Sequence, residues 1–299
     1  MKRKFSVLSS FLVFSVFLAK AELANSGMSF LQISSSAASA SLANVFAQSA
    51  QSPLAIFENP VGIRNENVTF ALSHHFWFSN ISLDALAFSI PLQKSTLGFG
   101  LNYVRIPGVE IRETPSSEPL AEVEPQYMAA AVGYTFSPVT NLLFGVTGKY
   151  LHEHLYTYTD DGFAFDFAVH WDAPSMLDVS VMVKNIGMLH SDTEANNLPS
   201  TLTIGVIRPE LFEGQNLNAG VGVNFGSNLN SQEAFVAAGL DLNFRNLLCL
   251  RGGFIHVGSI NRKSLGFGLN IERFNIDYAY LFMPEGLHNP HILTISYRP

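Results

Sequence analysis

The chain lacks several features that other membrane and exported proteins depend on. It has one cysteine, Cys249, so no internal disulfide can form. Charged residues make up 14% of the chain, against about 25% in an average soluble domain. After residue 21, no run of about 18 apolar residues occurs, so the sequence predicts no membrane-spanning helix. These absences exclude a disulfide scaffold and a helical membrane protein.

Basic residues are scarce as well. Four of the 17 lysines and arginines lie in residues 1–21, which leaves 13 against 24 acidic residues in residues 22–299, a formal charge of −11. Binding of nucleic acid depends on lysine and arginine contacts to phosphate. We therefore expect no nucleic-acid partner.

Motifs of catalysis and cofactor binding are absent. The sequence has no nucleophile elbow, phosphate loop, HExxH or paired-cysteine motif, so we expect no enzymatic activity and no cofactor. His152, Glu153 and His154 face Asp160 and Asp161 across an expected hairpin. Their spacing fixes no third ligand, so we interpret them as a solvated loop end and predict no metal site.

The N-terminus has the pattern of a secretory signal peptide. Basic residues at Lys2–Lys4 precede the apolar stretch Phe5–Leu18, and Ala19 and Ala21 are the small residues of a cleavage site. We predict a signal peptide over residues 1–21, an N-terminal hatch segment over residues 22–65 and a barrel over residues 66–299.

From residue 66 onward, apolar residues alternate with small or polar ones. The clearest stretch places Leu217, Ala219, Val221, Val223 and Phe225 on one face of a strand. The same pattern predicts fourteen strands near residues 66–78, 80–91, 95–104, 126–136, 141–153, 160–172, 177–185, 200–208, 216–226, 233–244, 247–257, 263–271, 274–283 and 290–298.

The connections between these strands separate by length. Short connections follow even-numbered strands, whereas the longest, at 105–125, 186–199 and 284–289, follow odd-numbered ones; the turn at 209–215 is longer than this rule predicts. Outer-membrane barrels have short periplasmic turns and longer outside loops. We therefore predict an all-β fold: a transmembrane antiparallel β-barrel in a bacterial outer membrane, with its bulky face against lipid and a small, wet inner face.

The N-terminal hatch differs in composition from the barrel. It is rich in serine and alanine, with a short helix expected around Ala37–Ala50, and it ends in the predicted turn of Asn59, Pro60 and Gly62. Pro60 cannot sit in a central strand. We expect this segment to pack within the barrel mouth, with a flexible arm as the alternative interpretation.

Charged residues on the inner face are the main candidates for function. Charges inside a membrane protein normally face its interior and pair with one another. Two hypotheses follow: the charges neutralise one another and fix the hatch, or they form a polar constriction that guides a substrate. By alternation, the inward-facing set is Lys149, Asp166, His170, Asp178, Lys184, Asp241, Arg251 and Asp277.

The longest outside loop is acidic. Long loops commonly carry the function of a barrel, so this loop is a candidate docking surface for a protein partner, with solvation as the alternative interpretation. Its acidic residues are Glu110, Glu113, Glu118, Glu122 and Glu124.

Several short stretches, taken in order, resemble the PorV/PorQ family of outer-membrane barrels, which is related to FadL-type fatty-acid channels. They are the turn Asn59-Pro60-Val61-Gly62, the corner Val183-Lys184-Asn185-Ile186-Gly187 and the late strand Asp277-Tyr278-Ala279-Tyr280. The resemblance implies a fourteen-stranded barrel with a lumenal N-terminal segment.

The resemblance leaves the function open between two classes. Some family members resemble type IX secretion components that bind secreted cargo or secretion-system proteins, which implies a non-enzymatic docking barrel. More distant relatives pass hydrophobic small molecules across the outer membrane, which is the alternative. A gap in the wall beside an apolar pocket under the hatch favours the channel, and a sealed lumen with ordered outside loops favours docking.

Overall fold

The computed structural model describes residues 27–112, 118–173, 177–190, 197–284 and 288–299. The predicted signal peptide and the turn after Ala173 lie outside these ranges. Within them, no helix is long and apolar enough to cross a membrane.

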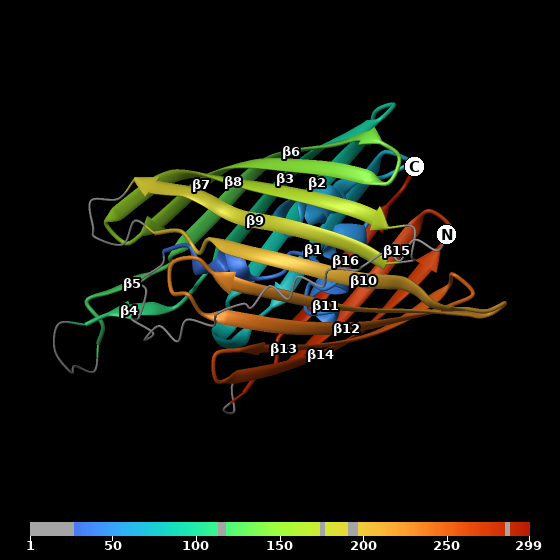
Figure 1. Ribbon diagram of the computed structural model, residues 1–299. Coiled ribbons are helices and arrows are strands. Elements are labelled where there is room, and N and C mark those ends of the chain that lie inside the picture. Colours follow the sequence, from blue (N-terminus) through green and yellow to red (C-terminus); the bar gives the residue numbers. More distant parts are fainter. Residues whose placement is uncertain (1–26, 113–117, 174–176, 191–196, 285–287) are drawn as a thin grey trace, which may run out of the picture.

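Fourteen antiparallel strands close into one barrel, as the sequence predicts (Figure 1). Each strand pairs with its neighbours in the chain, and β1 closes the ring against β16. The barrel strands are β1 Thr69–Phe76, β2 Ser82–Pro91, β3 Ser95–Arg105, β6 Gln126–Val139, β7 Leu142–Leu155, β8 Tyr158–Ala173, β9 Leu177–His190, β10 Thr201–Glu213, β11 Leu217–Asn228, β12 Ala234–Phe244, β13 Leu248–Val257, β14 Ile260–Ile271, β15 Phe274–Phe282 and β16 His291–Tyr297.

The acidic loop contains a small hairpin that the sequence pattern did not predict. Strands β4 (Val109–Ile111) and β5 (Ala121–Val123) pair with each other outside the barrel sheet. In Figure 1 they project at the end opposite the C-terminus. The described parts of the longest loop therefore include a hairpin that is separate from the barrel sheet.

The turn predicted at residues 209–215 is wrong. Strand β10 continues to Glu213 across an irregularity between Arg208 and Phe212, and the chain reverses only between Glu213 and Leu217. The long β10–β11 hairpin extends past its neighbours at the short-turn end in Figure 1. Pro209 misled the prediction, because proline is tolerated at a strand irregularity.

Strand β8 shows which side of the wall is apolar. Phe163, Phe165 and Phe167 are 59%, 47% and 51% exposed, whereas the intervening Ala164 and Asp166 are completely buried. Successive side chains of a strand point to opposite faces, so the exposed phenylalanines lie on the outer wall. A wall of this kind is stable against lipid, and its closed sheet leaves no unpaired edge strand.

The N-terminal hatch lies inside the barrel (Figure 1, blue). It is mostly 3₁₀-helical, and the helix predicted over residues 37–50 is shorter than expected, because Ala43 and Asn44 adopt positive φ angles that end it. The helical elements are η1 Ser29–Gln32, α1 Ala37–Ser41, η2 Ala47–Ser49, η3 Pro53–Phe57 and η4 Pro60–Ile63, with η5 Phe78–Asn80 in the β1–β2 connection.

Candidate functional site: the lumen around the N-terminal hatch

The N-terminal hatch forms the core of the molecule. Leu54, Ile56 and Ile63 are fully buried and pack in the largest hydrophobic cluster together with inward-facing residues of the wall, among them Leu83 and Leu151. The inner face was predicted to be small and wet. It is small, but much of it is dry, because the hatch fills the space beside it.

Small residues of the wall make room for this packing. A Cβ atom added to Gly100 would lie 2.8 Å from side-chain atoms of Ile56 and Phe57. A Cβ added to Gly145 would lie 2.7 Å from Pro60 Cβ and from the backbone nitrogen of Val61. Both distances are too short for a real side chain, so these glycines are part of the surface on which the hatch sits.

The predicted turn of Asn59, Pro60 and Gly62 forms the 3₁₀ helix η4. Asn59 Oδ1 accepts a hydrogen bond from Val61 N at 3.3 Å, and Pro60 occupies the first helical position, which needs no donor. Gly62 packs against Ala47 so closely that a Cβ would overlap the Ala47 carbonyl oxygen. The turn is fully buried.

Polar contacts tie the hatch to strands around the whole barrel. Asn59 Nδ2 donates to Ser180 Oγ on β9 at 3.3 Å, and Thr135 Oγ1 on β6 donates to the Pro60 carbonyl at 2.5 Å. Further bonds join Ala37 N to Thr294 Oγ1 (2.8 Å), Asn102 Nδ2 to Ser35 Oγ (3.2 Å), Asn224 Nδ2 to the Asn44 carbonyl (3.1 Å) and Ser264 Oγ to the Ser41 carbonyl (2.9 Å).

Glu58 organises the hatch itself. Its carboxylate accepts hydrogen bonds from the backbone nitrogens of Ser35 and Ser36, at 2.9 and 3.1 Å, and from the Ser39 hydroxyl. Burial raises the pKa of Glu58, and the hydrogen bond from Ser39 opposes that rise. The carboxylate thus joins the end of η3 to the start of α1.

Lys149 and Asp166 form a buried ion pair in the wall. Lys149 Nζ lies 2.5 Å from Asp166 Oδ2, and both side chains are at most 1% exposed. Asp166 Oδ1 also accepts from Asn185 N at 2.7 Å, where Lys184 and Asn185 of β9 together oppose the single residue Asp166. Asn185 has a φ of 56°, which asparagine tolerates better than most residues. The pair therefore fills a bulge in the sheet.

Lys184 lies at the same bulge and reaches the hatch. Its Nζ donates to the Phe57 carbonyl at 2.8 Å. Across the lumen, Arg251 pairs with Asp277 at 2.5 Å and with Asp241 at 3.5 Å. Six of the eight predicted inward-facing charges thus lie in two groups, one of which is bonded directly to the hatch.

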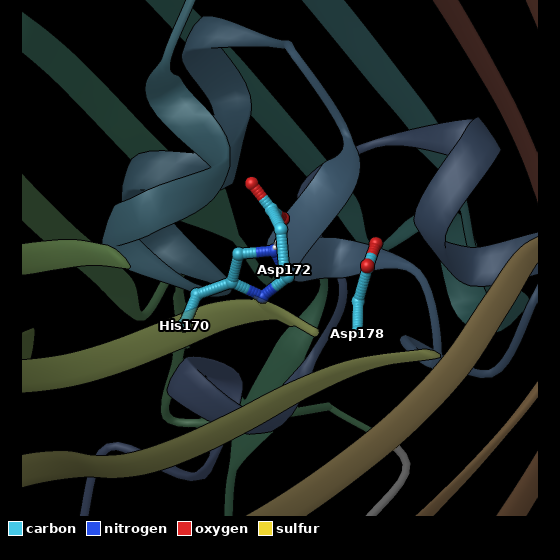
Figure 2. A group of neighbouring side chains, drawn as sticks. All are labelled: His170, Asp172 and Asp178. Carbon is cyan, nitrogen blue, oxygen red and sulfur yellow. Dashed lines mark hydrogen bonds and ion pairs between the residues drawn. The ribbon is translucent and has the colours of Figure 1, made fainter. Parts of the chain in front are cut away.

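The remaining two, His170 and Asp178, lie together at the short-turn end, with Asp172 between them (Figure 2). Asp172 was missed from the sequence, although it follows the same alternation as Asp166 and His170. One ligand atom from each of the three residues lies within 4.8 Å of the other two.

Residues of the acidic loop are partly neutralised. Arg112 pairs with Glu110 at 2.7 Å, and Arg105 pairs with Glu124 at 3.4 Å. Glu122 lies opposite Glu110 in the β4–β5 hairpin. Glu113 lies outside the described residues. His152, near this end of the barrel, pairs with Asp161 at 2.8 Å.

A cavity of about 180 Å³ remains between the hatch and the wall formed by β9 to β14. Its lining is mixed, with Leu31 and Ala47 from the hatch and Phe235 and Ile255 from the wall. Lys184 and Thr201 also line it, and they are the last residues that pair β9 with β10. Strand β9 continues for six more residues, to His190. In the described part of the chain, these residues pair with β8 and not with β10.

Comparisons with known proteins identify the fold. No protein-family model and no curated protein matches the chain. The monoaromatic hydrocarbon channel CymD matches with a TM-score of 0.61 at 11% identity, over 88% of this chain and 96% of that chain. The toluene transporter TodX of Pseudomonas putida matches with 0.60 at 11% identity, over 81% and 92%. A FadL homologue of Pseudomonas aeruginosa matches with 0.55 at 10% identity, over 88% and 98%.

At these identities the likeness concerns the fold. The chain has the fold of FadL-like outer-membrane channels, a closed barrel of fourteen strands. CymD is named as a channel and TodX as a transporter. The narrower resemblance to PorV/PorQ proteins stays a prediction.

Proposed function

We propose that the protein is an outer-membrane channel through which hydrophobic small molecules pass. This is the alternative drawn from the sequence, and it now has more support than a secretion-associated role. The observation that carries it is the cavity of about 180 Å³ between the N-terminal hatch and the wall, at the place where pairing of β9 with β10 ends.

The outer wall supports the membrane location. Phe70, Phe88 and Phe99 form a stack of rings on three neighbouring strands, and the outer wall of β8 carries further exposed phenylalanines. Exposed aromatics also occur at strand ends, as at Phe76 and Trp171. Such rings are typical of the interfaces between lipid and water. Lipid of the outer membrane is therefore the proposed partner of this surface.

The hatch argues against a water-filled diffusion pore. It is hydrogen-bonded to β3, β6, β9, β11, β14 and β16 and packed against β1. Its core residues Leu54, Ile56 and Ile63 are fully buried. Ions and sugars need a continuous polar path through a barrel. A barrel filled in this way favours a small solute that can use a narrow space of mixed lining, with apolar contacts at Leu31, Phe235 and Ile255.

The route that we propose runs beside the hatch. A molecule enters the cavity from the outside end, contacts Leu31, Phe235 and Ile255, and leaves near Lys184 and Thr201. There the β9 backbone beyond Lys184 has no β10 partner, and segment 198–200 bridges the wall through hydrogen bonds between Ser200, Pro199 and Asn185. The hydrogen bonds of a loop break more readily than those between two paired strands, so the wall can open most easily at this segment.

The solved structures are consistent with this proposal. CymD and TodX are named as channels or transporters of monoaromatic hydrocarbons, and they share the whole barrel fold with this chain. We extend to this protein only the class of solute, an apolar small molecule.

Uptake by intact cells tests the proposal. We would express the protein in a diderm host that lacks its own channels of this class and measure uptake of radiolabelled toluene. Wild-type protein is expected to raise uptake above the empty vector. Thr201→Trp fills the cavity and should return uptake towards the vector level, whereas Thr140→Trp, at an exposed turn, should not. Equal uptake by vector and wild type would contradict the proposal.

Docking of a protein partner on the acidic loop stays a prediction. Pull-down from detergent-solubilised outer membrane, followed by mass spectrometry, tests it. Secreted cargo or secretion-system proteins that are lost with a Glu118→Lys/Glu122→Lys variant would support docking, and recovery of lipid alone would contradict it.

A further inference from the structure

Three potential metal ligands meet on the inner face of the wall at the short-turn end (Figure 2). His170 and Asp172 are two residues apart on β8, so their side chains point to the same face. Asp178 lies directly opposite Asp172 in the register of β8 with β9. The three side chains therefore come from two adjacent strands that the barrel holds in fixed register.

The charges of this cluster require an explanation. Like charges directly opposite each other on paired strands are destabilising, and Asp172 and Asp178 are such a pair. Arg64 lines the same cavity, but no salt bridge within 4.0 Å joins it to either carboxylate among the residues described. A cation between the two strands would remove the repulsion.

His170 adds a buried imidazole nitrogen to the two carboxylates. Its side chain is only 4% exposed, and its Nε2 lies 2.7 Å from Asp172 Oδ1. The other ring nitrogen, Nδ1, is buried and has no hydrogen-bond partner. Nε2 is the nitrogen that lies beside Asp172, so it is the atom that would bind an ion shared with the carboxylates. Nδ1 would then carry the ring proton.

The cluster faces open space. His170, Asp172 and Asp178 line a cavity of about 340 Å³, which is closed on another side by Val61 and Gly62 of the hatch. This volume is large enough for a metal ion with bound water. The ligand atoms lie within 4.8 Å of one another, and bonds of about 2.1 Å from opposite sides of an ion span about 4.2 Å, so small side-chain rotations suffice.

We propose that His170, Asp172 and Asp178 bind a divalent transition-metal ion of the Zn²⁺ class. A set of one imidazole nitrogen and two carboxylate oxygens suits Zn²⁺ better than Ca²⁺ or Mg²⁺, which prefer oxygen ligands alone. The remaining coordination position faces the cavity. The bound ion ties β8 to β9 beside the hatch and neutralises the opposed carboxylates.

Titration with Zn²⁺ alone tests the site in the full-length protein, purified in detergent without a histidine tag and treated with a chelator. Isothermal titration calorimetry should find one ion bound per chain. His170→Gln and Asp178→Asn should each weaken binding at least tenfold. His152→Gln removes the imidazole from a comparable His–Asp pair at the other end of the barrel, and it should bind as the wild type does.

Thermal unfolding distinguishes loss of a ligand from loss of folding. Without metal, Asp178→Asn should melt at or above the wild-type temperature, because it removes the opposed charge. Zn²⁺ should raise the melting temperature of the wild type and of His152→Gln but leave that of Asp178→Asn unchanged. Failure of the wild type to bind one equivalent, or equal binding by His170→Gln, would overturn the proposal.

Discussion

Lys184 Nζ on β9 donates a hydrogen bond of 2.8 Å to the carbonyl oxygen of Phe57 in the N-terminal hatch. This bond joins the wall and the hatch at the place where β9 and β10 stop pairing. It also places a positive charge close to Glu58, the residue that organises the hatch. One of the bonds that position the hatch therefore comes from a side chain at the proposed exit of the channel.

Replacing Lys184 should loosen the hatch. A hydrogen bond to a charged group contributes about 1.5–3 kcal/mol, so Lys184→Met should speed hydrogen exchange of the hatch amides roughly ten- to hundredfold. Lys94→Met, at an exposed turn, is the matched control and should leave exchange unchanged. Unchanged protection of η3 in Lys184→Met would show that the bond does not hold the hatch.

The buried pair of Lys149 and Asp166 should be sensitive to the loss of one partner. Lys149→Met leaves the Asp166 carboxylate buried without its counter-charge, which costs about 3–5 kcal/mol. The double variant Lys149→Met/Asp166→Leu removes both charges and should recover part of that loss. Urea unfolding, monitored by heat-modifiable electrophoresis, measures the stability of the single and of the double variant. A double variant less stable than Lys149→Met would contradict this account.

Alanine variants of two glycines on β7 distinguish a change in hatch packing from an effect on the strand itself. Gly145→Ala places a Cβ against Pro60 and Val61 and should cost about 1–3 kcal/mol by overpacking. Gly148→Ala points to the outer wall, where the nearest atom is 3.5 Å away on the Phe165 ring. Limited proteolysis should cut the hatch faster in Gly145→Ala than in Gly148→Ala. Equal cleavage would be inconsistent with the docked hatch.

Docking of the hatch should depend on pH through Glu58, which lies outside the strands. Burial raises the pKa of Glu58, so the docked hatch holds this proton more tightly than the released hatch does. Docking is then strongest below the ordinary glutamate pKa and weakens as pH rises through the raised value. We would measure hydrogen exchange of the hatch amides from below the ordinary glutamate pKa to above the raised one, corrected for intrinsic rates. Exchange should become faster as pH rises in the wild type and in Glu66→Gln. The same pH dependence in Glu58→Gln would show that Glu58 is not its cause.

The barrel could be predicted from the sequence because lipid and lumen impose a period of two. Phe163 to Asp166 already show the alternation, and it repeats in every strand, so all fourteen strands were located to within a few residues, apart from extensions at His190 and Glu213. The β4–β5 hairpin was missed because three-residue strands carry no detectable period.

The lumen was harder to predict. Alternation alone indicated that Lys149 and Asp166 face inward, but their contact depends on strand register and on the bulge at Asn185, which no local pattern encodes. The glycines of the inner face led to the prediction of a water-filled lumen, although the hatch packs there. A small residue is compatible both with water and with a closely packed segment. Asp172 was overlooked, although alternation places it on the same face as His170.

The central claim is that an apolar solute passes beside a hatch that stays in place. An added Cβ at Gly98 would lie 3.8 Å from Ile63 Cβ, the separation typical of a disulfide, so Ile63→Cys/Gly98→Cys in a Cys249→Ser background can lock the hatch to β3. We predict that intact cells with the oxidised, locked protein take up labelled toluene as fast as cells with the reduced protein. Uptake that falls to the vector level on oxidation and returns on reduction would contradict the claim.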